Sequence, residues 1–348
     1  MFDLDKLIRA NIRRAVPYSS ARDEFKGEAR VFLDANENAW GSPLPERFNR
    51  YPDPLQSALK ERISRIKGVP AANIFLGNGS DEAIDLLYRA FCEPGRDNVV
   101  LVPPTYGMYE VAAVINDVAV RNVPLTAEFQ LNVEGISEMA DERTKLIFLC
   151  SPNNPTGNSL DRSDIEFVLN NFSGIVVIDE AYINFSRQRS FTTELQRYPN
   201  LVVLQTFSKA WGMAGLRVGM AFASEAVIAV LNRIKAPYNV NVASQELVMK
   251  ALDNIEQVNA WTRKTVEQRE WLRKELARSG RVEKVFESDA NFLLVRTANS
   301  AGLYHYLVGK GIVVRDRSKV MLCRDCLRIT VGTEQENILL LDALKQYT

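Results

Sequence analysis

The sequence has little histidine and little cysteine: His305 is the only histidine in 348 residues, and there are four cysteines. A single histidine leaves little room for serine–histidine–aspartate catalysis, and four scattered cysteines do not make a disulfide framework. Cys323 and Cys326 form a CxxC pair. A zinc site needs two more ligands, however, and a redox pair is expected early in a βαβ unit. We therefore interpret them as two loop thiols and expect no metal.

The chain also lacks an excess of charge of either sign, because 43 Lys and Arg residues balance 43 Asp and Glu residues. Such a balance provides no electrostatic footprint for nucleic acid or for an anionic membrane surface. No apolar run approaches the length of a membrane span, and the first residues, MFDLDKLIRANIRR, contain early acids and no apolar signal core. We therefore expect a cytoplasmic protein that binds neither nucleic acid nor membrane.

Helical patterns alternate with short β-rich runs from about residue 54 onward. These runs are IFLGNG, NVVLVPP, AVRNVPL, KLIFLCSP, GIVVIDEA, LVVLQTFS and VGMAFAS. Several are continuously apolar, which is typical of strands buried on both faces, and the alternation predicts an α/β fold with a mainly parallel sheet. We place an N-terminal arm at residues 1–30 and a large α/β domain at residues 31–242.

The pattern changes after APYNV, at residues 236–240. Long charged helices are predicted over residues 243–278, followed by NFLLVRT, a helix over SAGLYHYLVGKG, then IVVRD, LRITVG and a closing helix. This order predicts a smaller C-terminal α+β domain at residues 243–348, behind the first domain.

Polar or glycine-rich sequence follows four of the predicted strands: GNGSDE, SPNNPTG, DEAY and TFSK. Ligands of open parallel sheets collect at the carboxyl ends of the strands. A capped turn explains SPNNPTG well, because Asn, Pro and Gly are turn residues. It does not explain Asp179 and Lys209, since each follows an apolar run where a charge without a partner is costly.

A lysine, an aspartate and an anion site together indicate pyridoxal 5'-phosphate. An amine in a low-dielectric pocket is easily deprotonated and attacks an aldehyde to form a Schiff base, which makes Lys209 the candidate amine. An acidic residue, here Asp179, is the expected partner of the protonated ring nitrogen, which keeps the ring an electron sink.

The phosphate of this cofactor needs backbone N–H groups at the start of a helix, and GNGSDEAI supplies them after a strand. Gly79 allows close approach, and the N–H groups of Ser80 and Asp81 point at the anion; Ser208 adds a hydroxyl and Arg217 a positive charge. A dinucleotide site at the same place is rejected, because the third glycine of GxGxxG is replaced by Glu82.

The motif TFSKAWGMAG, together with SPNNPTG, IDEAY and the spacing to Arg217, resembles the class-II pyridoxal-phosphate aminotransferases with the aspartate-aminotransferase fold. Beyond this core, VPYSSAR, LDANEN, RYPDP, GNGSDE, PPTYGMY, IVVRD and CLRITVG resemble the histidinol-phosphate aminotransferases of histidine biosynthesis over nearly the whole chain. The resemblance implies a pyridoxal-phosphate-dependent transferase of fold type I. One departure is NENAWG, where Ala39 and Trp40 replace the more usual Pro-Tyr.

The resemblance also implies roles around the cofactor. Lys209 would carry the Schiff base and shuttle a proton between the substrate Cα and the cofactor, and Asp179 would pair with the ring nitrogen. Asn154 and Tyr182 would hydrogen-bond the ring oxygen, and Tyr106 would stack on the ring. The expected cofactor-binding residues also include Gly79, Ser80, Asp81, Thr206, Ser208 and Arg217.

A homodimer with shared sites is implied in the same way, with Tyr51 reaching the cofactor phosphate of the neighbouring subunit. Arg328 would bind the carboxylate of glutamate and help to hold histidinol phosphate, and Arg315, Tyr18 and Asn36 would line the substrate pocket. Without the resemblance, the tyrosines are equally well explained as core or turn residues, and the arginines as solvated residues of strand edges.

The expected reaction is the interconversion of L-histidinol phosphate and 2-oxoglutarate with imidazole-acetol phosphate and L-glutamate. Two alternatives share the fold and cofactor residues: an aromatic amino-acid aminotransferase and a threonine-phosphate decarboxylase. A regulator that senses pyridoxal phosphate would need a DNA-binding module, for which the first 30 residues are too few. A ligand-binding module without covalent chemistry would leave Lys209 unexplained.

Overall fold

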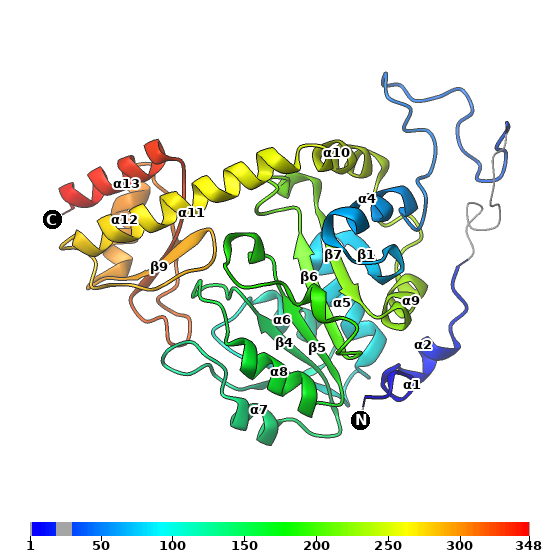
Figure 1. Ribbon diagram of the computed structural model, residues 1–348, viewed down its shortest axis with the longest axis horizontal. Coiled ribbons are helices and arrows are strands. Elements are labelled where there is room, and N and C mark those ends of the chain that lie inside the picture. Colours follow the sequence, from blue (N-terminus) through cyan, green and yellow to red (C-terminus); the bar gives the residue numbers. More distant parts are fainter. Residues whose placement is uncertain (1, 19–29, 348) are drawn as a thin grey trace.

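A seven-stranded sheet forms the centre of the larger part of the chain in the computed structural model, which describes residues 2–18 and 30–347 (Figure 1). The spatial order is β1 (Ile74–Asn78), β7 (Val218–Ala223), β6 (Leu201–Thr206), β5 (Ile175–Asp179), β4 (Thr144–Cys150), β2 (Asn98–Leu101) and β3 (Ala119–Asn122). The five strands from β6 to β3 in this order pair in parallel, and β7 runs antiparallel to both of its neighbours, β1 and β6. The predicted α/β fold with a mainly parallel sheet is confirmed.

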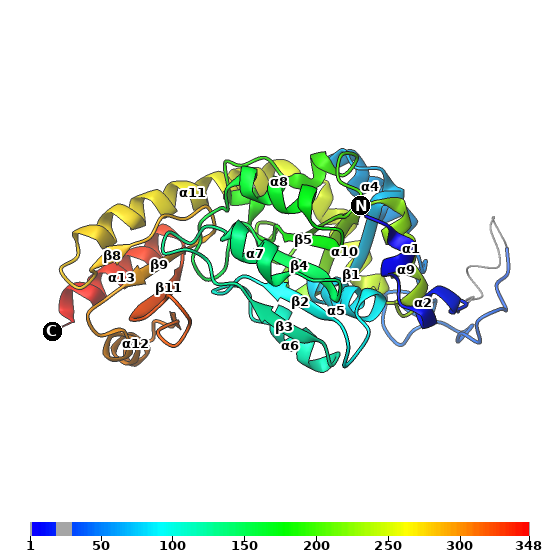
Figure 2. The ribbon, with the colours of Figure 1, turned by 90° about the horizontal axis from the view of Figure 1, so that it is seen from below.

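Helices cover both faces of this sheet (Figure 2). Side chains of β4 alternate between the faces: Ile147 and Leu149 belong to one apolar core, Leu146 and Phe148 to the other. This is the two-residue period of a strand buried on both sides. The first core contains side chains from α4 (Ser57–Lys67), α7 (Val133–Met139), α8 (Arg162–Asn171) and α10 (Val242–Leu252), and the second from α5 (Gly79–Phe91), α6 (Met108–Ile115) and α9 (Glu225–Ile234).

The described part of the expected N-terminal arm forms two short helices, α1 (Leu4–Leu7) and α2 (Ala10–Arg14). Ile8 between them is buried in the core on the α5 side, and the Arg9 amide donates to the carbonyl of Ala90 at 3.0 Å. Residues 19–29 of the arm lie outside the described residues. Single turns of 3₁₀ helix occur at η1 (Ala71–Asn73), η2 (Ile183–Phe185), η3 (Phe191–Glu194) and η4 (Ala214–Leu216).

A second, antiparallel sheet lies in the C-terminal part of the chain, as expected for an α+β unit. Its order is β10 (Arg315–Asp316), β11 (Cys326–Thr330), β9 (Phe292–Arg296) and β8 (Lys284–Val285). With it pack α12 (Ser300–Gly309), α13 (Glu334–Gln346) and the last part of α11 (Ile255–Arg278). Cys326 is the first residue of β11 and Cys323 lies in the preceding turn. Both thiols are free and buried, so the interpretation as two loop thiols is wrong for Cys326.

The long helix α11 joins the two parts of the molecule (Figure 1). Val258, near its start, belongs to the core of the large sheet, and Leu272 and Leu276, near its end, belong to the core of the small one. Val248 and Leu252 of α10 also pack with the large sheet. The division at residue 242 therefore stays a proposal, with α11 as the connection between the two units.

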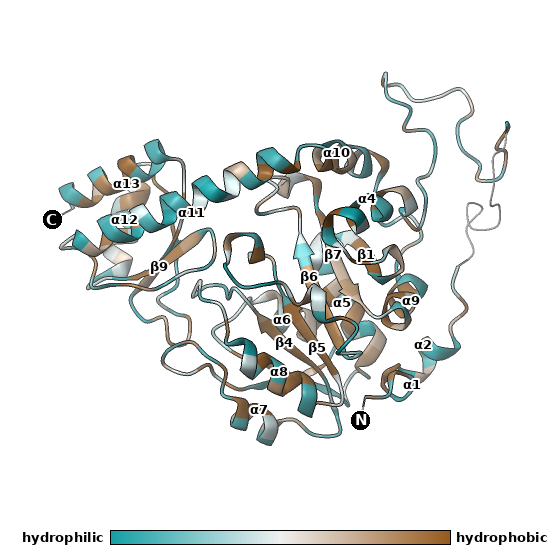
Figure 3. Ribbon diagram, in the orientation of Figure 1, coloured by the Kyte–Doolittle hydropathy of each residue, from teal (hydrophilic) through white to brown (hydrophobic). Residues whose placement is uncertain are grey.

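The hydropathy of each residue follows this layering: the strands of the large sheet are mostly hydrophobic and α11 is mostly hydrophilic (Figure 3). None of the helices in the described part of the chain is both long enough and apolar enough to span a membrane.

Candidate active site

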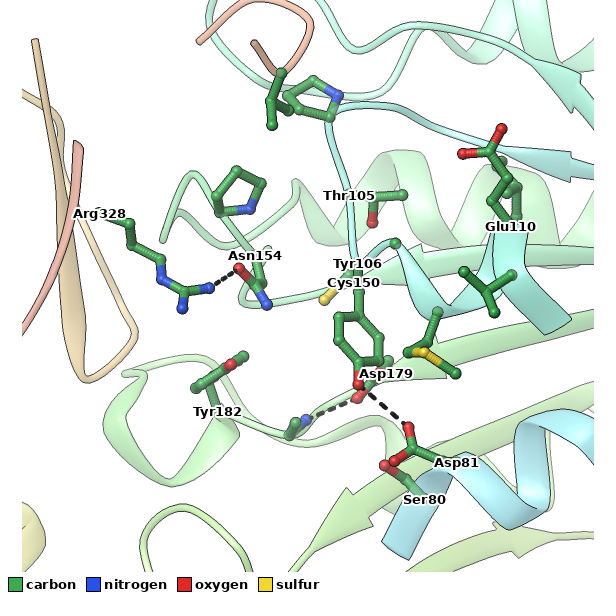
Figure 4. Close-up of a pocket in the computed structure, with 18 of the residues that line it drawn as sticks. Ser80, Asp81, Thr105, Tyr106, Glu110, Cys150, Asn154, Asp179, Tyr182 and Arg328 are labelled. Carbon is green, nitrogen blue, oxygen red and sulfur yellow. Dashed lines mark hydrogen bonds between the residues drawn. The ribbon is translucent and has the colours of Figure 1, made fainter. Parts of the chain in front are cut away.

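A cavity of about 840 Å³ lies where β1, β2, β4, β5 and β6 end, next to the small C-terminal sheet. This is the edge at which open parallel sheets bind their ligands. Figure 4 shows side chains from both sheets pointing into it. The predicted site residues that line this cavity are Gly79, Ser80, Asp81, Tyr106, Asn154, Asp179, Tyr182, Thr206, Ser208, Lys209, Arg217, Arg315 and Arg328.

Three predicted site residues do not line this cavity within the chain. Asn36 and Tyr51 line a separate cavity of about 520 Å³, where the Tyr51 ring stacks on Tyr238 with 4.5 Å between centroids. Tyr18 is 73% exposed. The expectation that Tyr51 acts in the site of a neighbouring subunit stays a prediction. Asn36 and Tyr18 were expected in the substrate pocket, and one chain alone does not place them there.

The start of α5 forms a cradle for an anion. Gly79 has φ +70°, and a Cβ built on it would lie 2.6 Å from Nη2 of Arg217. A Cβ on Gly219 of the neighbouring strand would lie 2.1 Å from the backbone N of Ser80. Both positions therefore require glycine, and this close approach leaves the N–H groups of the first turn of a 13-residue helix facing the cavity.

Charged and hydroxyl side chains complete this cradle. Arg217 pairs with the Asp81 carboxylate at 3.1 Å and donates to Oγ of Ser208 at 3.4 Å. The Tyr106 hydroxyl donates to Asp81 at 3.2 Å, and the hydroxyls of Thr206 and Ser208 lie 2.9 Å apart. Figure 4 shows Tyr106 and Asp81 pointing toward one another across the cavity. The Arg217 guanidinium and the hydroxyls of Thr206, Ser208 and Tyr106 are donors of the kind that binds phosphate oxygens in proteins.

Asp179 ends β5 and is buried, with 3% of its surface exposed. Its Oδ2 accepts a hydrogen bond from the Tyr109 hydroxyl at 2.7 Å, and its Oδ1 accepts one from the Ala181 amide at 3.0 Å. Burial raises the pKa of Asp179, and the Tyr109 hydrogen bond opposes this rise. No cation of the described chain forms an ion pair with it, so the carboxylate is suited to a positively charged ligand atom.

Lys209 follows β6 and reaches into the cavity, with its Nζ 5.5 Å from the centre of the Tyr182 ring. The Lys209 side chain is exposed, because the cavity beside it is open. The sequence had predicted a buried lysine at this position. The pKa of Lys209 is still lowered, first by desolvation and then by the positive charge of Arg328. A lowered pKa increases the fraction of neutral, nucleophilic amine.

The small sheet contributes a cationic wall. Arg315 and Arg328 are register partners across β10 and β11, and Nη1 of Arg328 donates to Oδ1 of Asn154 at 2.5 Å. This bond occupies the amide oxygen of Asn154, so its NH₂ group remains the donor toward a ligand oxygen. Tyr182 is buried and packs edge-on against Phe292 of β9.

Two residues at this site, one behind the cavity and one on its lining, were not predicted from the sequence. Tyr109 is completely buried behind Asp179, and Arg317 lines the cavity near Arg315. Tyr109 lies three residues after Tyr106, and Arg317 lies two residues after Arg315. The two-residue spacing along an extended segment was a signal for a shared face.

The site fits pyridoxal phosphate. Its phosphate would lie at the start of α5, near Ser80, Ser208 and Arg217, and its ring nitrogen would face Asp179. Lys209 would be the amine at its aldehyde. The cradle that a Cβ at Gly79 would fill and the carboxylate without an ion pair are the observations that support this fit.

Comparison with known proteins agrees with this geometry. The pattern of the aminotransferase class I and II family matches residues 33–344. A histidinol-phosphate aminotransferase of Parabacteroides distasonis is 57% identical over 345 residues, which is 99% of each chain, and one of Cytophaga hutchinsonii is 55% identical over 346 residues, also 99% of each. The crystal structure of the histidinol-phosphate aminotransferase from Clostridium acetobutylicum superposes with a TM-score of 0.79 at 26% identity, covering 86% of this chain and 90% of that one. The chain therefore belongs to the aminotransferase class I and II family.

Proposed function

We propose that this chain is a pyridoxal-phosphate-dependent aminotransferase of histidine biosynthesis. It interconverts L-histidinol phosphate and 2-oxoglutarate with imidazole-acetol phosphate and L-glutamate. Full-length relatives with that name, at 55% and 57% identity, support the substrate. The observation that carries the proposal is one cavity that brings together the Lys209 amine, the Asp179 carboxylate and the guanidinium of Arg328.

When bound, pyridoxal phosphate supplies an aldehyde that reacts with amines and a ring that stabilises negative charge at the substrate Cα. Asp179 holds a proton on the ring nitrogen, because a buried carboxylate favours a positive partner. Lys209 moves the proton at Cα, acting as general base and then as general acid in each half-reaction. Its lowered pKa suits this double role.

The remaining groups bind and orient. Ser80, Ser208 and Arg217 hold the cofactor phosphate at the start of α5, and the NH₂ group of Asn154 and the Tyr182 hydroxyl hold the ring oxygen. Arg328 and Arg315 hold the substrate anion, since a planar guanidinium fork binds either a carboxylate or a phosphate. These assignments agree with the positions of the residues around the cavity.

The active unit in this proposal is a homodimer in which each chain completes its partner's site. Tyr51, Asn36 and Tyr18 lie outside the chain's own cavity, and large apolar side chains are exposed on the same segment, with Leu33 at 85% and Trp40 at 99%. Exposed apolar groups of this kind mark contact surfaces. A second copy of the chain covers them in the dimer.

Mixing two inactive variants tests the shared site. Lys209→Ala and Tyr51→Ala are each expected to inactivate their own homodimer. After subunit exchange, a twofold-symmetric mixed dimer has one site with neither substitution, so about a quarter of wild-type activity returns. Mixtures that stay inactive despite proven subunit exchange would reject the shared site.

Substrate identity is tested by absorbance titration of the cofactor-loaded protein. L-histidinol phosphate, L-phenylalanine and L-threonine phosphate are added separately, and loss of the cofactor's visible band followed by its recovery with 2-oxoglutarate is measured. Conversion at the lowest concentration of histidinol phosphate supports the proposal. A stronger response to phenylalanine would favour an aromatic aminotransferase, and release of carbon dioxide from threonine phosphate would favour a decarboxylase.

The location proposed for the enzyme is the cytoplasm. Its four cysteines are free and buried in the structure, which agrees with a reducing compartment. Fractionation of the source cells with an antibody to the chain measures this directly, and recovery in a membrane or extracellular fraction would reject it.

A further inference from the structure

Arg317 is a third guanidinium on the cationic wall of the cavity. It follows β10, and its backbone N–H donates to the carbonyl of Cys326 at 2.9 Å, next to the paired Arg315 and Arg328. All three side chains line the same cavity. The backbone hydrogen bond fixes where the Arg317 side chain starts, so this wall is built into the fold.

Within the part of the chain that the structure describes, the guanidinium of Arg317 has no protein acceptor. Its Nε is buried and makes no hydrogen bond, and within residues 2–18 and 30–347 the chain offers this side chain no ion pair. Arg162, by contrast, pairs with Glu166 at 3.0 Å and Glu194 at 2.8 Å. The Nε of Arg296 is also buried without a hydrogen bond, but Arg296 does not line this cavity. A buried donor without an acceptor is costly, so an acceptor from outside the chain is expected at this place.

Like charges surround this donor. Desolvation and the positive charges of Arg328 and Arg315 lower the pKa of Arg317. An arginine nevertheless stays protonated near neutral pH. Three guanidiniums without a carboxylate among them repel one another. An anion with more than one charge relieves that repulsion better than a single carboxylate does.

The two amino donors of the proposed reaction, histidinol phosphate and glutamate, differ in the charge and the number of oxygens of their anionic groups. A phosphate monoester carries a charge of about −1.5 to −2 at pH 7 and presents three acceptor oxygens. A carboxylate carries one charge and two oxygens, which one guanidinium fork satisfies. One Nη of Arg328 is already used by Asn154, so a phosphate at this wall needs further donors.

We propose that Arg317 is a specificity-determining residue that binds the phosphate group of the phosphorylated substrate, whereas the carboxylate of glutamate is held at the same wall without it. The inference rests on the proposed function. It extends the substrate site beyond the two arginines expected from the sequence, and it predicts a preference for phosphate over carboxylate that depends on one side chain.

The test compares Arg317→Gln with wild type on two amino donors, L-histidinol phosphate and L-glutamate, in steady-state assays of the holoenzyme. Loss of one charge-assisted contact is expected to raise KM for histidinol phosphate about 10–100-fold with little change in kcat, and to change KM for glutamate less than about threefold. Arg317→Lys, which keeps the charge but not the fork, recovers part of the loss. Arg324→Gln is the matched control on the same segment, because the Arg324 side chain is 93% exposed and pairs with its neighbour Asp325.

A pH profile separates binding from a structural effect. The second pKa of a phosphate monoester is about 6, so the wild-type preference for histidinol phosphate falls below that pH, and in Arg317→Gln this fall is smaller. Equal losses on both donors, or no loss on either, would overturn the inference while the wild-type activity upholds the proposed function. A wild-type enzyme that uses glutamate but not histidinol phosphate would overturn both.

Discussion

Replacing Tyr109 with phenylalanine removes one hydroxyl and leaves the rest of a buried ring in place. That hydroxyl donates to Oδ2 of Asp179 at 2.7 Å, and the Tyr109 ring stacks on Phe148 with 4.8 Å between centroids. Tyr109 is completely buried and only 3% of Asp179 is exposed, so water does not reach the position of the lost hydroxyl. The variant therefore isolates one hydrogen bond to the acid that is proposed to face the cofactor ring.

The size of the effect follows from the charge of the acceptor. A hydrogen bond to a charged group contributes about 1.5–3 kcal/mol, which corresponds to roughly a 10–150-fold change in an equilibrium constant. The Tyr109 hydrogen bond lowers the pKa of Asp179, against the rise caused by burial. Without it the carboxylate is protonated more readily and pairs less well with a protonated ring nitrogen. We expect weaker binding of pyridoxal phosphate, by about one to two orders of magnitude.

The assay is titration of the apo-protein with pyridoxal phosphate, followed by its absorbance. Tyr88→Phe is the matched control, because the Tyr88 hydroxyl is equally buried but donates to the backbone carbonyl of Tyr109 at 2.8 Å. Both variants are expected to lose about 1–2 kcal/mol of unfolding free energy, and only Tyr109→Phe weakens cofactor binding. Equal cofactor affinity in the two variants would refute the reasoning.

Three further outcomes are expected. Lys209→Ala abolishes transamination, and substantial residual turnover measured with histidinol phosphate would contradict the proposed mechanism. Gly79→Ala places a Cβ 2.6 Å from the Arg217 guanidinium at φ +70°, so cofactor affinity falls at least tenfold and thermal unfolding shows a loss of about 1–3 kcal/mol; wild-type affinity would argue against the cradle. Arg328→Gln removes a positive charge that lowers the pKa of Lys209, so this pKa rises and the amine loses its proton at higher pH. The pH dependence of amine labelling in the apo-protein measures the shift, and an unchanged or lower midpoint would contradict it.

Much of the site was predictable because strands of a parallel sheet end at one edge. The polar residues at or just after the ends of β4, β5 and β6, such as Asn154, Asp179 and Lys209, meet in one cavity for that reason. Arg315 and Arg328, on two strands of the small sheet, could be assigned to the site only through the family resemblance, since an arginine on a short strand is usually solvated. The exposure of Lys209 was not predictable, because it depends on how the small sheet stands beside the cavity.

Residues that support a site residue without lining the cavity themselves are harder to predict from the sequence. Tyr109 lies within a helix and reads as a core aromatic until Asp179, from a strand seventy residues later, lies against it. The antiparallel direction of β7 was missed for a similar reason: its apolar sequence VGMAFA is equally suited to either direction. Direction and long-range partners are properties of the connections between elements, which local patterns do not contain.

The position of β1 at the edge of the large sheet has a consequence for biosynthesis. Its ladder partner is β7, and Ile74 pairs with Phe222. At about 5–20 residues per second, the roughly 150 residues between these partners take on the order of 10 s to be made. During that time the apolar strand Ile74–Asn78 emerges from the ribosome without its partner, and Ser80 without the close approach of Gly219. The cofactor cradle is therefore a late feature of the nascent chain, although its first residues are among the early ones to be synthesised.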